Sequence, residues 1–188
     1  MTRAGYAALN TKVRAMAAQS PSPSAEHAAK ILPWLPDRTQ RAVVLALVGT
    51  PPSQRDVTFF LSLQQRMGWL DEKNRRIMLR LLGAEADLRN LTWLYRLKSF
   101  FKQTETYGEL IPVRHRLHPD LVRRWANLPT AQALQQAVQA TPPFTTLCTT
   151  HPNFWHTEQA LHHALRAHYT TEKRTHPNSL AAVCAALI

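Results

Sequence analysis

The spacing of apolar residues predicts helices along almost the whole chain. Over residues 4–18, Tyr6, Leu9, Val13 and Met16 follow one another at steps of three or four, the periodicity of an amphipathic helix. Alternation of apolar and polar residues at a period of two, which would indicate strands, is nearly absent. The pattern predicts an all-α fold, a bundle of about eight to ten helices.

Helix breakers and capping residues divide this pattern into elements. The run Ser-Pro-Ser-Pro-Ser follows the first helix, so residues 19–24 are a candidate linker. Ser24, Asp37 and Thr130 precede apolar periodic segments and are expected to be N-caps. Beyond the linker, a helix is expected from Ser24 to Pro33, and short helices are expected between Gly108 and Pro129. The other expected helices lie within residues 37–48, 53–67, 129–144, 153–174 and 177–188.

The longest expected element lies in the middle of the chain. The segment from Asp71 to about Gln103 has no proline, and Gly83 is its only glycine. This composition predicts one long helix over about 71–103, roughly 50 Å at the rise of an α-helix, or two helices kinked near the glycine. One face of this segment forms an apolar stripe that should face the core: Ile77, Leu81, Ala84, Leu88, Leu91 and Tyr95.

Two polar residues, Asp87 and Asn90, fall beside this stripe, at a seam between helices. A carboxylate at such a seam must be hydrogen-bonded or paired with a cation, since burying it alone costs several kcal/mol. We therefore interpret the two residues as a polar clamp between helices. Glu85 and Arg89 lie four apart on another face, so an ion pair worth a few tenths of a kcal/mol is expected. Glu85 and Asp87 point about 160° apart on a helix and cannot share a substrate.

The same segment resembles a helix of the central-stalk subunit of V/A-type rotary ATPases, called C in prokaryotes and d in eukaryotes. The matching residues are Glu85, Asp87, Leu88, Asn90, Leu91, Arg96 and Lys98. Other fragments match in the order of the family: a turn with a Leu-Ile-Pro core at 107–117, a short-helix segment at 121–147 and a helix start at 177–188. An opening helix also matches, through Tyr6, Leu9, Asn10 and Arg14. The chain is identified as a short member of this family.

The resemblance implies an all-helical, non-catalytic coupling subunit. Family members form a funnel of three lobes, seated on the cytoplasmic face of the membrane ring that carries protons or sodium ions. The funnel receives the rotating shaft, so that torque from ATP hydrolysis reaches the ring. The expected partners are therefore the shaft and ring subunits, reached through protein contacts at the cytoplasmic face, with no cofactor and no small-molecule substrate.

The length of the chain modifies this expectation. The family's chains are nearly twice as long and carry the Asp-x-x-Asn-Leu helix once per lobe, whereas that helix is found once here. The chain is expected to resemble one to two lobes. It is either a diverged paralogue or a short form that assembles with copies of itself.

Composition agrees with a globular cytoplasmic protein. With 188 residues, of which 45% are hydrophobic and 19% charged, a single all-helical domain over 1–188 is expected. No apolar run approaches the roughly 20 residues of a membrane span, and the N-terminus lacks the features of a secretory signal. The two cysteines, Cys148 and Cys184, have no metal-type spacing and favour a reduced, cytoplasmic compartment.

Net charge adds a second interpretation. The chain carries 23 Lys and Arg against 12 Asp and Glu, a formal charge of +11 that favours anionic partners. A candidate basic interaction surface comprises Arg75, Arg76, Arg114, Arg116, Arg123 and Arg124. With Trp125 or Tyr107 to stack on bases, it supports the alternative of a basic helical nucleic-acid-binding or adaptor protein. A solvated helical face is the simpler interpretation of such charge runs.

Signatures of catalysis and metal binding are missing from the sequence. The histidines near the C-terminus lack the separation of four that places two imidazoles on one ion, and no nucleophile elbow or phosphate-binding loop occurs. We therefore expect no enzymatic activity, no metal and no cofactor. The bulky aromatic residues are expected to anchor the core and interfaces: Trp34, Phe59, Phe60, Trp69, Trp93, Phe100, Phe101 and Trp155.

Overall fold

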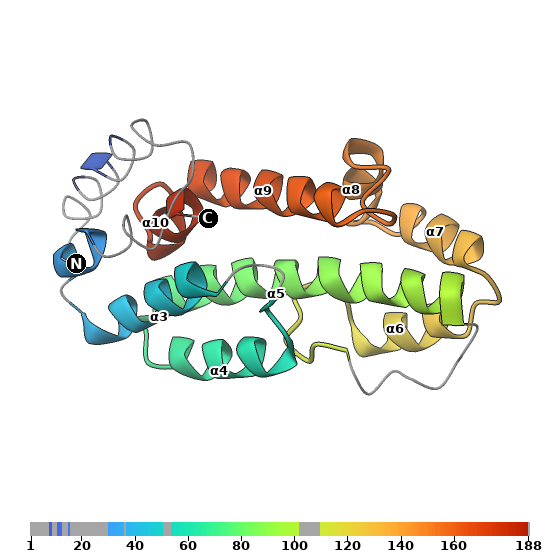
Figure 1. The fold of residues 1–188 in the computed structure, drawn as a ribbon, viewed down its shortest axis with the longest axis horizontal. Coiled ribbons are helices and arrows are strands. Elements are labelled where there is room, and N and C mark those ends of the chain that lie inside the picture. The colour runs from blue at the N-terminus through green and yellow to red at the C-terminus, as the bar shows by residue number, and fades with distance from the viewer. Residues whose placement is uncertain are drawn as a thin grey trace. The chain divides into compact units, whose positions relative to one another are not determined.

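The computed structural model describes residues 8, 11, 12, 15, 30–35, 37–50, 54–101 and 110–187. All regular structure in these residues is helical, which confirms the expected all-α class (Figure 1). Tyr6, Asn10, Arg14, Ser24 and the candidate linker lie outside the described residues. In chain order the elements are η1 (Leu32–Trp34), α3 (Arg38–Gly49), α4 (Val57–Met67), α5 (Glu72–Arg96), η3 (Leu97–Phe101, π-helical), α6 (Pro119–Ala126), α7 (Ala131–Gln139), α8 (Thr145–Thr150), α9 (Glu158–Thr175) and α10 (Leu180–Leu187).

The chain divides into two compact units. Unit 1 comprises Met1–Leu81 and His168–Ile188, and unit 2 comprises Leu82–Ala167. The boundaries fall inside α5 and α9, so each of these helices contributes residues to both units. The expectation of a single domain over 1–188 stays a prediction.

Unit 1 is organised around α3, which packs against η1, α4 and α10 (Figure 1). The helix begins after Asp37, whose Oδ1 accepts a hydrogen bond from the Thr39 amide at 2.7 Å, so the expected N-cap is confirmed. α4 begins in the same way after Asp56. α10 is apolar around its whole circumference and contributes five buried residues to the core: Leu180, Ala181, Ala182, Val183 and Cys184.

Unit 2 has its own hydrophobic core, formed by α5 together with α6 to α9 and the residues between them. α6 packs on α7, and α7 on α8. The hydroxyl of Thr130 accepts a hydrogen bond from the Ala133 amide at 3.1 Å, which confirms this residue as the N-cap of α7. Aromatic rings fill the centre of this core, where Trp125 meets Phe144 edge-on at 5.8 Å between ring centroids.

α5 runs without interruption from Glu72 to Arg96 and continues into the π-helical turn of η3. The segment therefore forms one long helix, as expected, and is not divided into two helices near Gly83. Four residues of the expected stripe are buried, while Ala84 and Tyr95 are half-buried. Burial extends to other faces of the helix, at Met78, Leu82, Ala86 and Leu94. α5 is therefore enclosed on more than one side, which explains why its sequence is only weakly amphipathic.

Gly83 has a packing role in this helix. A Cβ atom at this position would lie 2.8 Å from the carbonyl carbon of Arg114 and 2.9 Å from its oxygen, distances that real contacts do not reach. The glycine therefore lets the backbone around residue 114 approach α5 directly.

Candidate functional site

The segment 110–117, which follows η3, lies against α5 within unit 2 and is held there by Asp87. This carboxylate is only 3% exposed. Its oxygens accept backbone hydrogen bonds from three successive residues: His115 at 3.2 and 3.3 Å, Arg116 at 2.6 Å and Leu117 at 3.1 Å. The buried charge is thus satisfied by amide dipoles and needs no ion-pair partner.

Opposing influences act on the pKa of Asp87. Burial raises this pKa above its ordinary value, because removal from water disfavours the charged form. The three amide donors, together with the positive charge of Arg114, act in the opposite direction. The net effect is a raised pKa, so the fold holds this carboxylate at some electrostatic cost.

Asn90, about one turn further along α5, binds the other end of the same segment. Its Nδ2 donates to the carbonyl oxygen of Ile111 at 2.9 Å, and its Oδ1 accepts from the Ile111 amide at 2.8 Å. Both backbone polar groups of the buried Ile111 are thereby satisfied by one side chain. With Asp87, this residue fixes the segment at both ends, while the side chains of Leu110, Ile111 and Leu117 are buried.

Glu85 and Arg89 form the expected ion pair. Its expected strength was that of a pair on a solvated helix surface, whereas Glu85 is buried. Nε and one terminal nitrogen of Arg89 donate to Oε1 of Glu85 at 3.1 and 2.9 Å, and the glutamate is 0% exposed. The value of a few tenths of a kcal/mol applies to solvated helix surfaces. The strength of this pair, in which the glutamate is buried, stays a prediction.

The remaining family-motif residues join α5 and η3 to two further elements of unit 2. Lys98 donates to the carbonyl oxygens of Ala126 and Leu128, at 2.6 and 2.5 Å, and so caps the end of α6. Burial lowers the pKa of this lysine. Arg96 reaches Glu158 at the start of α9, at 3.3 Å, in a partly solvated pair that adds little stability.

Sequence reasoning missed a second polar contact on α5. Asn74 is buried in unit 1, where its Oδ1 accepts from the Leu180 amide at 2.9 Å and its Nδ2 donates to Asp71 at 2.6 Å. It thus ties the beginning of α5 to the beginning of α10. The spacing Asp-x-x-Asn at 71–74 repeats that at 87–90 and is the signal that could have found it.

Two arginines that join elements of unit 1 were also missed. Arg55 is buried in unit 1 and donates to the carbonyl oxygens of Leu47 and Thr50, at 2.7 and 3.1 Å, at the end of α3. Arg80 donates to Glu172 at 2.9 Å, so it links α5 to α9 within the same unit. These arginines follow no sequence motif that distinguishes them from solvated ones.

The candidate basic surface is distributed over both units. Arg75 and Arg76 lie on α5 in unit 1, where both pair with Glu72. The other four belong to unit 2, in the segment before α6 or on α6 itself. Neither unit by itself contains all six arginines, and a common groove for phosphates stays a prediction.

No metal-binding arrangement occurs among the described residues, since no three His, Cys, Asp or Glu side chains are grouped to hold an ion. Cys148 and Cys184 are free thiols, and burial raises their pKa values to about 11 and about 12, respectively. Thiols with such pKa values are poor nucleophiles at neutral pH. Among the described helices, none combines the length and apolarity that a membrane crossing requires.

Comparison with known families agrees with the resemblance seen in the sequence. Searches of curated proteins and of solved structures find no match. In contrast, the family described as ATP synthase (C/AC39) subunit matches residues 56–188. This region contains α4 to α10 and all the contacts of Asp87, Asn90 and Lys98 described above. Because the match covers well over half of the chain, the protein belongs to the ATP synthase (C/AC39) subunit family.

Proposed function

We propose that the chain is a non-catalytic subunit of a V/A-type rotary ATPase that couples the central shaft to the ion-carrying membrane ring. Its contribution to ATP-driven proton or sodium transport is mechanical, and its place is peripheral, on the cytoplasmic face of the membrane. The observation that carries this proposal is the family match over residues 56–188.

The contacts of α5 support a mechanical role. A coupling element must transmit force without yielding, which requires its parts to be joined by buried contacts that break only with the fold. In unit 2, Asp87, Asn90 and Lys98 join one helix and its π-helical extension to the segment 110–117 and to the end of α6. These polar groups are engaged with the backbone, so their hydrogen-bonding capacity serves the fold and not a substrate.

Exposed aromatic residues supply candidate contacts with other subunits. Trp69 in unit 1 is 79% exposed, and Phe100 in unit 2 is 76% exposed, in contrast to the buried Phe60 and Trp155. Large aromatic side chains are enriched among the residues that dominate the energy of protein–protein interfaces. We assign Trp69 and Phe100 as contact residues for the shaft, the ring or a second copy of this chain.

Affinity purification from the native host tests the proposal. A tagged chain recovered from gently solubilised membranes should bring down the shaft and ring subunits of the rotary ATPase. The mass of the recovered complex then gives the number of copies of this chain. Recovery of the tagged chain without any ATPase subunit, under conditions where the rest of the ATPase stays assembled, would contradict the proposal.

Surface variants make the same experiment specific. Trp69→Ser and Phe100→Ser should each reduce the recovery of ATPase subunits, because each removes an exposed apolar anchor. Gln64→Ser, at an exposed polar position of α4, is the matched control and should leave recovery unchanged. Unchanged thermal unfolding of all three variants would show that the effect lies in binding.

A further inference from the structure

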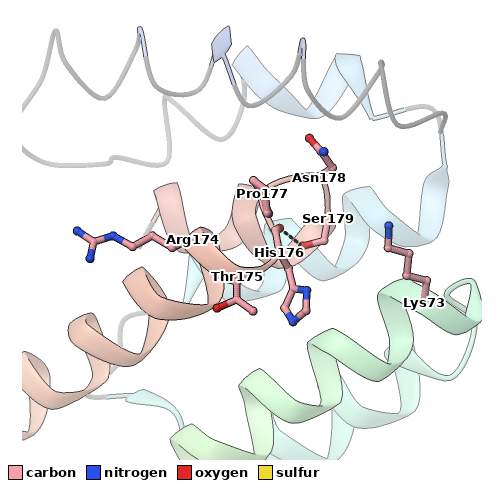
Figure 2. Close-up of a pocket in the computed structure, with 7 residues that line it drawn as sticks. All are labelled: Lys73, Arg174, Thr175, His176, Pro177, Asn178 and Ser179. Carbon is pink, nitrogen blue, oxygen red and sulfur yellow. Dashed lines mark hydrogen bonds between the residues drawn. The ribbon is translucent and has the colours of Figure 1, made fainter.

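Unit 1 contains a pocket at the turn between α9 and α10, shown in Figure 2. Its volume is about 430 Å³, within the range of small-molecule sites. One lining residue comes from the beginning of α5 and six come from the end of α9 and the turn after it: Lys73, Arg174, Thr175, His176, Pro177, Asn178 and Ser179.

All ionisable residues of this lining are basic. They are Lys73, Arg174 and His176, and no carboxylate from the described part of the chain lines the pocket. Figure 2 shows the lysine and the arginine on opposite sides of the histidine. Both are exposed, and neither takes part in an ion pair among the described residues. The pocket thus carries positive charge that its own walls do not neutralise.

The acidic residues near the pocket are engaged elsewhere. Glu172 accepts a hydrogen bond from Arg80 at 2.9 Å, and the same guanidinium also contacts the ring of His176. Glu72, beside Lys73 in sequence, pairs with the two arginines that follow on α5. Glu172 also lies 3.9 Å from Nε2 of His176, and Asp71 accepts hydrogen bonds from Asn74. The positive charge of the lining therefore belongs to Lys73 and Arg174.

The turn that forms the pocket wall is fixed by hydrogen bonds. The hydroxyl of Ser179 donates to the carbonyl oxygen of His176 at 2.7 Å, which Figure 2 marks. The next residue, Leu180, opens α10 and is held by Asn74 through its amide. The N-terminal end of α10, with its partial positive charge, thus lies directly after the lining residues 174–179. The wall is formed in advance of any ligand, which lowers the entropy cost of binding.

We propose that this pocket binds a phosphate-bearing anion. Its lining is polar and cationic, so a small charged ligand suits it better than an apolar one. Cations on two sides favour a ligand with at least two negative charges, such as inorganic pyrophosphate or the phosphorylated headgroup of an anionic lipid. This inference does not depend on the proposed coupling function.

Titration of the full-length protein with inorganic pyrophosphate, followed by calorimetry, tests the site. Lys73→Gln combined with Arg174→Gln should weaken binding about tenfold or more, because it removes two charge-assisted contacts. Arg123→Gln combined with Arg124→Gln removes the same charge from exposed positions of α6, outside the pocket, and should change affinity by less than about twofold. An equal loss in both double variants would overturn the proposal. So would absence of pyrophosphate binding together with absence of pocket-dependent binding to anionic vesicles in the experiment that follows.

The source of the phosphate is resolved by a second arm with vesicles. Vesicles of phosphatidylcholine alone are compared with vesicles that also contain phosphatidic acid, in a flotation assay. Binding to the anionic vesicles that is lost in the Lys73→Gln, Arg174→Gln variant identifies a lipid headgroup as a ligand. Binding of pyrophosphate with no pocket-dependent binding to vesicles identifies a free anion. Both results support the pocket, whereas vesicle binding that is equal in the two double variants and no pyrophosphate binding would contradict it.

Discussion

At the scale of the residue, Asp87 joins α5 to the segment 110–117 through backbone hydrogen bonds. Its carboxylate is the shared acceptor for three successive backbone amides of the segment 110–117, and the residue is only 3% exposed. Replacement by alanine leaves these donors without the acceptor. We predict that Asp87→Ala lowers the free energy of unfolding by about 1–3 kcal/mol, measured by urea denaturation.

Two further variants separate this effect from a general loss of charge. Asp87→Asn keeps a side-chain oxygen and should recover part of the loss, with the rest explained by the weaker neutral acceptor. Asp120→Ala removes a carboxylate that is 66% exposed and should change stability by less than about 0.5 kcal/mol. Wild-type stability of Asp87→Ala would show that the amides find another acceptor.

The two cysteines give a prediction on reactivity. The thiols of Cys148 and Cys184 are buried, with pKa values raised to about 11 and about 12. The reactive thiolate is therefore scarce at neutral pH, and reagents do not reach it. We predict labelling by a thiol reagent on the order of a hundredfold slower in the folded protein than in urea. Equal rates in the two states would contradict the burial of both thiols.

The sequence indicates which residues need partners at this scale, but not which partners they have. A polar side chain beside the apolar stripe of a helix must be satisfied, so the clamp role of Asp87 and Asn90 could be inferred. Their partners are backbone groups of 110–117, which lie 21 to 30 residues away along the chain, and backbone amides leave no side-chain signal. The burial of Glu85 could not be inferred either, because α5 is enclosed on more than one face.

At the scale of the element, α5 depends on its close approach to the segment 110–117. A methyl group at position 83 would meet the backbone of Arg114 at 2.8 Å, and backbone cannot move aside as a side-chain end can. We predict that Gly83→Ala lowers the free energy of unfolding by about 1–3 kcal/mol, despite the higher helix propensity of alanine. Thermal or urea unfolding measures this effect.

A second glycine provides the matched control. Gly49 is the last residue of α3, and a Cβ atom there would have no neighbour within 4 Å. Gly49→Ala should therefore be neutral or stabilise by up to about 1 kcal/mol, through helix propensity and the reduced entropy of the unfolded chain. If both variants shift stability in the same direction, the contact with Arg114 is not what requires Gly83.

The positions of most helices could be predicted from the sequence, because periodicity and capping depend on residues close together in the chain. The N-caps Asp37 and Thr130 and the long central helix follow from residues a few positions apart. The need for glycine at position 83 could not be predicted from the sequence. The backbone that approaches α5 there belongs to Arg114, about thirty residues later in the chain. The π-helical turn of η3 has no sequence signal that we can name.

At the scale of the whole molecule, the fold class and the family could both be predicted, whereas the pairing of distant helices could not. Helical periodicity gives the all-α class, and the spacing from Glu85 to Lys98 indicates the family that matches residues 56–188. The packing of α10 against α3 within unit 1 joins residues from opposite ends of the chain. Apolar residues around all of α10 show that it is buried, but not which helix covers it.

ATP-driven ion transport in membranes of the native host, with and without this chain, tests the coupling role most directly. Membranes that lack the chain should lose ATP-driven proton or sodium uptake, because torque no longer reaches the ring, and reintroduction of the wild-type chain should restore it. ATP hydrolysis by the catalytic subunits, measured in parallel, shows that they remain present. Unchanged ion uptake by an intact ATPase that lacks the chain would contradict the account.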